Sequence, residues 1–539
     1  MALLVEGLGS VSFEEVCRRF GVEPGFPVVA WRVNGVLRPL SWVVDEGSTV
    51  ELVDTTSFEG VSVYRNSLIF LLARACRDLF GRELRVLHSI SDGYYCEVEG
   101  LELAPQQVEL VRSKALELVD RSLPFKRYLM PRDRAMRVFS AQGFHDKEAL
   151  VRWVGLDPVE VYELEGFYGT FLSPLVPDTS FLRVFELRPF EAGFVVQFPT
   201  VSSPLGLPPF RPALRLSSVF REYARWLSIL GLEDVSSLHE MVSSGRALEL
   251  VLVSEALHSR RFFEIACEVR DREARLVCVA GPSAAGKTTT AHRLSVWLRL
   301  LGLKPYVISL DDYFVDRERT PRDEKGDYDF EALEALDLPF LEEQLKALLA
   351  GDEVVLPRYN FHTGRRERGR PLRLEGGAVL VLEGIHGLNE AVSHFVPRAQ
   401  KVKVFVSPLT ALSLDRHNRI STGDTRLLRR LVRDHRTRGR SAESTLSRWP
   451  SVVRGASRYI FPYQEEADVM FNSALVYEIS VLKAYAEPLL RSIPDTSPQY
   501  GEARRLLSVL SYLPSIPPEV VPTDSVLREF IGGGLFEVV

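Results

Sequence analysis

The sequence predicts a modular α/β protein whose largest part is a doubly wound parallel sheet that follows two smaller modules. Three observations lead to this prediction. The chain has 539 residues, which is too many for one hydrophobic core. Near its start, short alternating apolar runs are broken by turn signals, as in β-rich modules. Further on, the apolar strand 276–280 runs through a glycine-rich turn directly into a helix, as at the start of a nucleotide-binding α/β unit.

The composition is that of a folded protein without a general attraction to polyanions. Hydrophobic residues make up 46% and charged residues 26%, and the net charge is -6, so a polyanion site must be a local concentration of positive charge. The five cysteines are scattered without a Cys-x-x-Cys pair, which fits a reducing cytoplasm. The first residues lack a basic segment followed by an apolar core, and no apolar run reaches ~18 residues. We expect a cytoplasmic protein that does not contact membranes.

Residues 1–60 predict a small β-grasp module. The apolar run 27–33 is followed by Asn34-Gly35, a strong hairpin signal, and a second run covers 49–53. Residues 13–20 predict one short helix. This region resembles the TGS domain at the N-terminus of threonyl-tRNA synthetases.

Residues 61–212 predict an α+β module that opens with a helix at 66–80 and closes with the turn-rich stretch 202–212. It resembles the second N-terminal domain of the same synthetases, which carries an editing site. In that family the helix opens with two histidines four residues apart, and a Cys-x-x-x-His follows later. Here Asn66 and Phe70 stand at the histidine positions, and 167–170 has no cysteine. The resemblance therefore implies a structural or binding module without editing chemistry.

Two further regions read as helical. Residues 213–272 show helical periodicity and predict a connector. Residues 474–539 predict a helical tail. Within it, prolines between 514 and 522 force an extended path before a last short helix at 525–531. The intervening residues 273–473 are predicted to form the doubly wound domain.

The strongest motif is Gly281-Pro-Ser-Ala-Ala-Gly286-Lys287-Thr288, which matches G-x-x-x-x-G-K-[ST] between a buried strand and a helix. Its glycines let backbone N–H groups point into one concavity, and the helix N-terminus adds positive potential there. Lys287 is expected to reach the β- and γ-phosphates of ATP, and Thr288 to ligate Mg²⁺. The expected ATP-binding residues are Gly281, Ser283, Ala284, Ala285, Gly286, Lys287, Thr288, Thr289 and Arg433.

A second strand, 379–382, ends in Glu383. A carboxylate at the tip of a parallel strand beside the P-loop lies where the Mg²⁺ shell needs one, so Glu383 is the expected partner of Thr288. A solvated turn is the alternative.

Three segments predict an acceptor pocket. The strand 307–310 ends in Asp311, which could deprotonate an attacking hydroxyl, or cap a helix. Asp329, between two aromatic residues, could hold both hydroxyls of a ribose, or act as an N-cap. Tyr359 and its aromatic neighbours in 356–366 could stack on a base, although alternating aromatic residues are equally typical of a half-buried strand.

Residues 426–440 carry seven arginines, more than a solvated helix requires in an acidic protein. We interpret this segment as a lid that stabilises charge on the transferring phosphoryl group and excludes water. A nucleic-acid-binding helix is the alternative.

Together these motifs, in this order over about 276–471, resemble the uridine-cytidine kinase family; the last is Arg-Arg-x-x-Arg-Asp-x-x-x-Arg-Gly-Arg. The resemblance implies that Asp311 is the catalytic base, that Asp329 and Tyr359 contact the nucleoside, and that the lid arginines serve ATP. Gly364 stands where human-type members have a base-reading histidine, and His362 is a candidate substitute. The expected catalytic residues are Asp311, Lys287, Arg436 and Arg438, and the expected substrate residues are Asp329, Tyr359, His362, Arg366 and Arg440.

The sequence thus predicts an Mg²⁺-dependent kinase that transfers the γ-phosphate of ATP to the 5'-hydroxyl of uridine or cytidine. A phosphoribulokinase-like sugar kinase is one alternative. Another is an RNA-associated regulatory protein that uses the P-loop as a switch. RNA or tRNA contact through the N-terminal modules and a homo-oligomeric state are further expectations.

Overall fold

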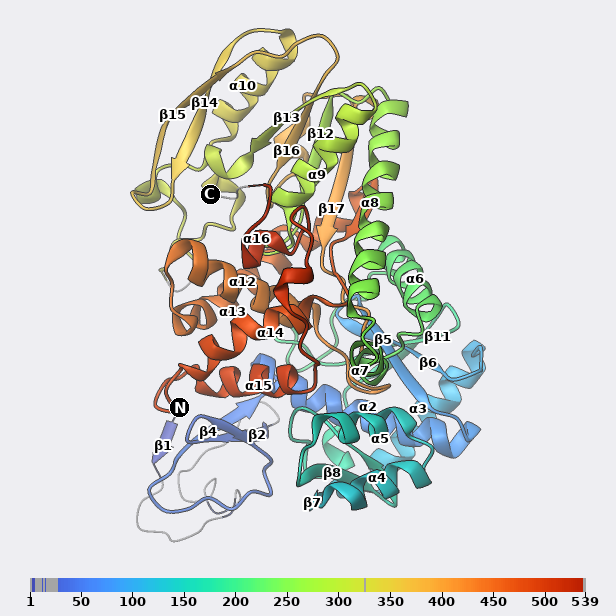
Figure 1. The fold of residues 1–539 in the computed structure, drawn as a ribbon. Helices are drawn as coiled ribbons and strands as arrows, with labels where there is room; N and C mark the ends of the chain where they lie inside the picture. Colours follow the sequence, from blue (N-terminus) through green and yellow to red (C-terminus); the bar gives the residue numbers. More distant parts are fainter. Residues whose placement is uncertain (1, 5–11, 13–14, 16–27, 324–325, 537–539) are drawn as a thin grey trace.

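The P-loop domain is built on five parallel strands. The computed structural model describes residues 2–4, 12, 15, 28–323 and 326–536 (Figure 1). In this sheet the strand order is β13-β16-β12-β17-β18, so β12 lies in the middle, and all five of its residues are buried. Because the strands are parallel, their carboxyl ends share one edge. The strands are β12 (Leu276–Ala280), β13 (Lys304–Ser309), β16 (Ala378–Glu383), β17 (Lys401–Ser407) and β18 (Val469–Asn472).

Helices cover both faces of this sheet. Val277 and Val279 of β12 belong to the core cluster that includes α9 and α14, whereas Leu276 and Cys278 pack in the cluster that includes α10. This alternation is what a doubly wound sheet requires, and it confirms the predicted fold class. The helices are α9 (Lys287–Leu300), α10 (Leu338–Ala350), α11 (Glu390–Ser393), α12 (Thr422–Arg438), α13 (Ala442–Tyr459) and α14 (Glu478–Arg491).

A long hairpin extends from the P-loop domain, visible in yellow beside α10 (Figure 1). It consists of β14 (Val354–Asn360) and β15 (Arg365–Leu372), and it pairs Tyr359 with Arg366. The predicted aromatic segment therefore forms one strand of a hairpin and its turn.

The first module is a four-stranded antiparallel sheet with the order β1-β4-β2-β3. Asn34 and Gly35 both have positive φ, 49° and 76°, as a type I′ turn needs, and the predicted hairpin is confirmed. The predicted helix at 13–20 falls almost wholly outside the described residues. The strands are β1 (Ala2–Leu4), β2 (Val28–Val33), β3 (Val36–Arg38) and β4 (Thr49–Asp54).

The second module combines helices with two small antiparallel sheets, β10-β11-β6-β5 and β7-β8-β9. Its first helix, α2 (Phe58–Phe80), begins eight residues earlier than predicted because Ser57 caps it and accepts a hydrogen bond from the Gly60 N–H. The other elements are β5 (Leu84–Ile90), β6 (Gly93–Val98), α3 (Pro105–Asp120), β7 (Lys126–Met130), α4 (Arg132–Ala141), α5 (His145–Val154), β8 (Val159–Leu164), β9 (Phe167–Gly169), β10 (Glu186–Phe190) and β11 (Gly193–Gln197).

An aromatic cluster surrounds the positions that carry histidines in the synthetases. The Phe70 ring centroid lies 5.4 Å from that of Phe167 and 5.3 Å from that of Phe171. The Asn66 side-chain amide donates to the Ser173 hydroxyl at 2.8 Å. The side chains at these two positions therefore serve packing and a local hydrogen bond, and the missing editing chemistry stays a prediction.

The connector is helical, as predicted, and consists of α6 (Leu214–Ile229), α7 (Val235–Ser243) and α8 (Ala247–Asp271). Beyond α14, helices α15 (Tyr500–Ser511) and α16 (Arg528–Ile531) return to the P-loop domain. Leu482, Leu506 and Phe530 from these three helices share one buried cluster with β12. The C-terminal region is therefore part of the same core as the sheet. The domain limits drawn from the sequence stay predictions.

A loop of the P-loop domain, residues 413–419 after β17, is inserted against the second module. Lys147 of α5 forms an ion pair with Asp415 at 2.8 Å, and neither side chain is more than 1% exposed. The Arg416 carbonyl accepts from the Val86 N–H at 2.9 Å, and the Asn418 amide donates to the Thr170 carbonyl at 2.8 Å. This loop joins the two halves of the protein through buried polar contacts.

Candidate active site

The P-loop lies at the carboxyl edge of the sheet between β12 and α9. Gly281 passes so close to β17 that a Cβ there would lie 2.0 Å from the Val406 carbonyl oxygen. Gly286 has φ +86° at the N-cap of α9, and Ala284 also adopts a positive φ of 61°. Lys287 donates to the Pro282 carbonyl at 3.2 Å, so its ammonium folds back over the loop. This geometry forms the phosphate cradle that the motif predicts.

Three arginines of α12 donate hydrogen bonds to this loop. Arg426 donates to the Ser283 carbonyl at 3.0 Å, and Arg430 donates to the Ser283 hydroxyl at 2.9 Å. Arg429 is fully buried, donates to the Ala285 carbonyl at 3.3 Å, and is paired with Glu478. The first two thirds of α12 thus form a fixed support of the P-loop. The lid interpretation stays a prediction for the segment from Arg433 onward.

Two neighbouring strands bring carboxylates to the same edge. Ser309 and Glu383 are register partners, and the Ser309 hydroxyl donates to Glu383 at 2.7 Å. Asp311 follows Ser309 in a short 3₁₀ turn whose backbone is tied to the Ser309 side chain. Burial and the charge of Asp311 raise the pKa of Glu383, and Lys287 opposes this rise. The three predicted groups therefore lie in one electrostatic environment.

Glu331 belongs to this group, although the sequence reasoning did not single it out. Its Oε2 atom is buried without a hydrogen-bond partner in the part of the chain that the structure describes. Burial and the charge of Asp311 raise the pKa of Glu331, whereas the positive charges of Arg430 and Lys287 lower it. The residue follows the Tyr-Asp-Phe motif directly, and this position was the only signal that could have found it.

Asp329, chosen from that motif, has other partners. Its carboxylate accepts from the Glu331 N–H at 3.1 Å and lies 3.4 Å from the Tyr459 hydroxyl. The first contact closes a local turn of the backbone. The next helical turn is Leu333–Ala335 with Ala332 at its N-cap, so Asp329 is not the helix N-cap that was the alternative. Asp329 therefore orders the segment that carries Glu331, and its contact with a ribose stays a prediction.

Tyr359 is buried in an aromatic cluster next to Asp312. Its ring meets Phe314 and Phe361 edge to face at centroid distances of 5.6 and 5.1 Å. Its backbone N–H donates to the Asp312 carboxylate at 3.1 Å. Within the described residues its buried hydroxyl has no partner, so it can accept or donate a hydrogen bond to a ligand.

The turn and second strand of the hairpin hold three positions that were singled out from the sequence, His362, Gly364 and Arg366. The imidazole of His362 belongs to an exposed residue of the turn. Gly364 is buried with φ +72°, and a Cβ there would lie 2.7–2.8 Å from Arg317 atoms, so the Arg317 side chain fills the space beside it. Arg366 forms an ion pair with Asp337 at 2.9 Å and stacks over Phe340. Arg366 therefore joins the hairpin to α10, and its role in binding substrate stays a prediction.

The expected lid arginines gather around one buried carboxylate, Asp434. Arg433 donates to it at 2.8 Å, and Arg438 and Arg440 lie 3.5 and 3.8 Å away. Burial opposes ionisation, yet Arg433, Arg430 and Arg438 hold the pKa of Asp434 below its usual range. One carboxylate cannot neutralise several guanidinium groups, so this end of α12 keeps a net positive charge that suits phosphates.

Arg436 has a different environment from the other lid arginines. It points to the C-terminal segment and donates to the backbone carbonyls of Glu529 and Phe530 at 3.0 and 3.1 Å.

The residues at the strand edge fit a magnesium ion. Mg²⁺ prefers oxygen donors, with one or two protein ligands and the rest from water and phosphate. The Thr288 hydroxyl and the buried Glu383 carboxylate supply such donors, and the unfavourable charge between Glu383 and Asp311 is what a divalent cation would relieve.

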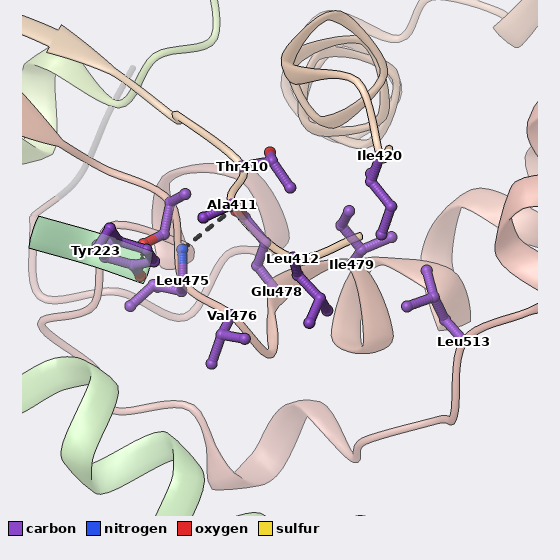
Figure 2. Close-up of a pocket in the computed structure, with 11 residues that line it drawn as sticks. Tyr223, Thr410, Ala411, Leu412, Ile420, Leu475, Val476, Glu478, Ile479 and Leu513 are labelled. Carbon is purple, nitrogen blue, oxygen red and sulfur yellow. Dashed lines mark hydrogen bonds between the residues drawn. The ribbon is translucent and has the colours of Figure 1, made fainter. Parts of the chain in front are cut away.

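A small cavity is lined in part by Glu478, the partner of Arg429 (Figure 2). Its volume is about 10 Å³, near the space of a single water, so it cannot hold a nucleoside. Its walls are mainly aliphatic and include Leu412, Ile420, Leu475, Val476 and Ile479.

Comparison with known proteins finds relatives for two separate parts of the chain. Residues 276–480 match the model of the phosphoribulokinase / uridine kinase family. The uridine kinase of Chloroflexus aurantiacus (strain J-10-fl) is 33% identical over 198 residues, which are 36% of this chain and 85% of that protein. The chain belongs to the phosphoribulokinase/uridine kinase family. A solved structure described as a possible uridine kinase from Bacillus stearothermophilus is 20% identical, with a TM-score of 0.27, over 39% of this chain and 98% of that chain.

The N-terminal part is similar to a different protein. The threonine--tRNA ligase of Azoarcus sp. (strain BH72) is 31% identical over 187 residues, which are 34% of this chain. The chain spans only 29% of that ligase, so the similarity concerns its synthetase-like modules and not the whole enzyme. In this family member, a P-loop domain therefore follows modules of synthetase type. Across the described ranges, no helix is long and apolar enough to cross a membrane.

Proposed function

We propose that this protein is an ATP-dependent nucleoside kinase that phosphorylates the 5'-hydroxyl of uridine or cytidine. The observation that carries the proposal is the convergence of Lys287, Asp311, Glu331 and Glu383 at one edge of the sheet, next to the Tyr359 aromatic cluster. Phosphoryl transfer needs little covalent chemistry from the protein, and positioning with electrostatic stabilisation is what this edge offers.

The residues divide into a donor side and an acceptor side. The P-loop N–H groups and Lys287 bind the phosphates, and the positive end of α12 stabilises charge on the transferring group. Bound Mg²⁺ would neutralise charge on the β- and γ-phosphates, held by Thr288 and Glu383. On the acceptor side, Asp311 accepts the proton of the attacking hydroxyl as the O–P bond forms.

The acceptor pocket supports a nucleoside in two ways. The free Tyr359 hydroxyl and its aromatic neighbours provide a stacking surface with one polar handle. The Glu331 Oε2 atom lacks a partner among the described residues and can accept hydrogen bonds from sugar hydroxyls. The relative from Chloroflexus carries the name uridine kinase, which agrees with this acceptor.

A sugar phosphate is the second candidate acceptor, and one observation favours it. Arg317 fills the space beside Gly364, Arg438 lies over the Phe361 ring at 5.7 Å, and Arg440 is close enough to Arg317 for the two charges to interact. Such a group of guanidinium ions suits an acceptor that already carries a phosphate.

A panel of nucleosides and sugar phosphates, assayed with ATP and Mg²⁺, separates the two candidates. Uridine or cytidine should turn over, and Asp311→Asn should lower kcat about 10²- to 10⁴-fold because the proton acceptor is lost. The exposed Asp352 provides a matched control in the same domain, and Asp352→Asn should leave kcat unchanged. Turnover of sugar phosphates alone, or full activity of Asp311→Asn, would contradict the proposal.

The N-terminal modules are proposed to contact RNA or tRNA, by analogy with the ligase whose name includes tRNA. A cytoplasmic location and a homo-oligomeric state complete the proposal. Binding of tRNA to the full chain, measured with and without ATP, tests the first point.

A further inference from the structure

The C-terminal segment 524–536 covers the P-loop. After the proline-rich stretch the chain turns into α16, which packs against α12 close to α9 (Figure 1). Val526, Leu527 and Phe530 are fully buried, and the Phe530 ring lies under the Arg429 guanidinium at 4.9 Å. The segment is thus anchored in the same core that supports the phosphate cradle.

The Glu529 carboxylate occupies an anion position of that cradle. One of its oxygens accepts from the Thr289 N–H at 3.2 Å and from the Thr289 hydroxyl at 3.0 Å. Thr289 is the third residue of α9, and the N–H groups of the first helical turn have no partner within the helix and bind phosphates in P-loop proteins. Glu529 is 7% exposed, and its charge adds to the rise in the pKa of Glu383. A side chain 240 residues away therefore provides the anion that this turn would otherwise receive from a ligand.

Two more groups expected to serve ATP are engaged by the same segment. A Cβ on Gly286 would lie 2.4 Å from the Val526 side chain, so Val526 packs directly on the P-loop glycine. Arg436 donates two hydrogen bonds to the carbonyls of Glu529 and Phe530. The P-loop glycine Gly286, the Thr289 N–H and the lid arginine Arg436 are thus all in contact with one short segment.

A simple capping role explains only part of this arrangement. A cap would need the carboxylate at Thr289, but not the apolar contact on Gly286 or the use of Arg436. Moreover, two anions cannot share one N–H group in a buried site without strong repulsion. Nucleotide and Glu529 must therefore exclude each other at Thr289.

We propose that residues 524–536 form an autoinhibitory segment that closes the ATP site and must move before nucleotide binds. The inference rests on the proposed function in that ATP is the ligand of the P-loop. Three consecutive glycines, residues 532–534, follow α16, and φ is +86° and +68° at the first two. These glycines leave the end of the segment beyond α16 free of side-chain packing constraints. Release of the segment also frees Arg436 to bind the phosphates. The same movement therefore opens the ATP site and supplies it with this arginine.

The test measures nucleotide affinity without an acceptor. Calorimetry of the full chain with ATP and with ADP is compared between wild type, Glu529→Gln and Glu529→Ala. Both variants weaken the closed state by removing a charge-assisted contact, so the Kd should fall roughly 10- to 100-fold. The exposed Glu519 precedes this segment in the short 3₁₀ turn Pro518–Val520, and Glu519→Gln should stay within about twofold of wild type.

Hydrogen exchange of the wild-type protein gives an independent readout. ATP should increase exchange in 526–535 because the segment leaves its site. An unchanged or higher Kd in Glu529→Ala, or protection of 526–535 by ATP, would show that the segment is a wall of the nucleotide pocket and would overturn the inference. If Glu529→Ala binds ATP more tightly but no panel compound is phosphorylated, only the proposed function fails. If uridine is phosphorylated but affinity and exchange do not respond, only this inference fails.

Discussion

The Arg429–Glu478 pair is predicted to be a main determinant of the stability of the P-loop domain. Arg429 Nε lies 2.7 Å from the carboxylate, and the two side chains are 0% and 2% exposed. The same guanidinium donates to the Ser473 carbonyl at 2.8 Å and to the P-loop. Removal of one partner of a buried pair leaves an uncompensated charge and costs about 3–5 kcal/mol. Arg429→Met should therefore lower the free energy of unfolding by about this amount.

The assay is urea unfolding of wild type, Arg429→Met, Glu478→Gln and the double variant, followed by tryptophan fluorescence and circular dichroism. In the double variant neither charge is left alone, so it should be at least about 2 kcal/mol more stable than the sum of the single losses predicts. Arg448 is an exposed arginine of the neighbouring helix, and Arg448→Met should cost no more than about 0.5 kcal/mol. A coupling energy below about 0.5 kcal/mol would refute the reasoning.

The loss in Arg429→Met should also depend on pH. Burial raises the pKa of Glu478, and Arg429 opposes this rise. Without the arginine the folded-state pKa rises further above the unfolded value, so protonation of Glu478 stabilises the folded variant at low pH. This stabilisation disappears as the pH rises through the folded-state pKa. The difference between variant and wild type should therefore grow from pH 5 to pH 8, and a constant difference would contradict this explanation.

Three shorter predictions concern other sites. Lys147→Met breaks the buried pair with Asp415 and should cost about 3–5 kcal/mol, measured as a lower Tm; a shift below 2 °C would argue against that pair. Tyr359→Phe removes a hydroxyl without a partner in the described chain, so Tm should hold while KM for the nucleoside rises about 2- to 10-fold; an unchanged KM places the hydroxyl outside the pocket. Glu383 takes up its proton at a higher pH than an ordinary glutamate, and a metal needs the deprotonated form. Binding of Mg²⁺ should therefore weaken as the pH is lowered through this raised pKa, and Glu383→Gln should bind Mg²⁺ weakly without that pH dependence.

The features that the sequence predicted best are local. A P-loop is defined by glycines, a lysine and a hydroxyl within eight residues, and the strand and helix beside it are read from the same stretch. The ends of β13 and β16 were placed together because parallel strands share an edge, and the pairing of Ser309 with Glu383 agrees. The α2 helix was predicted too short, because its first turns depend on the Ser57 cap and not on apolar periodicity.

Roles that depend on distant partners were not predictable. Arg426, Arg429 and Arg430 stood in the arginine-rich segment, but nothing in their spacing separates arginines that support the loop from those that face a phosphate. No sequence pattern predicted the ion pair of Arg366 with Asp337. In each case one side chain can satisfy its charge in several ways, and only the tertiary fold selects among them.

The loop 413–419 has a consequence for how the polypeptide is made. Lys147 is synthesised well before its partner Asp415, and at ~5–20 residues per second the ribosome needs on the order of half a minute to supply it. During that interval the second module carries a lysine that lacks its ion-pair partner Asp415, and the neighbouring Asp146 is the carboxylate that interacts with it. The final burial of this residue therefore waits for the C-terminal half, and a nascent chain stalled before residue 415 should remain open to protease along this face.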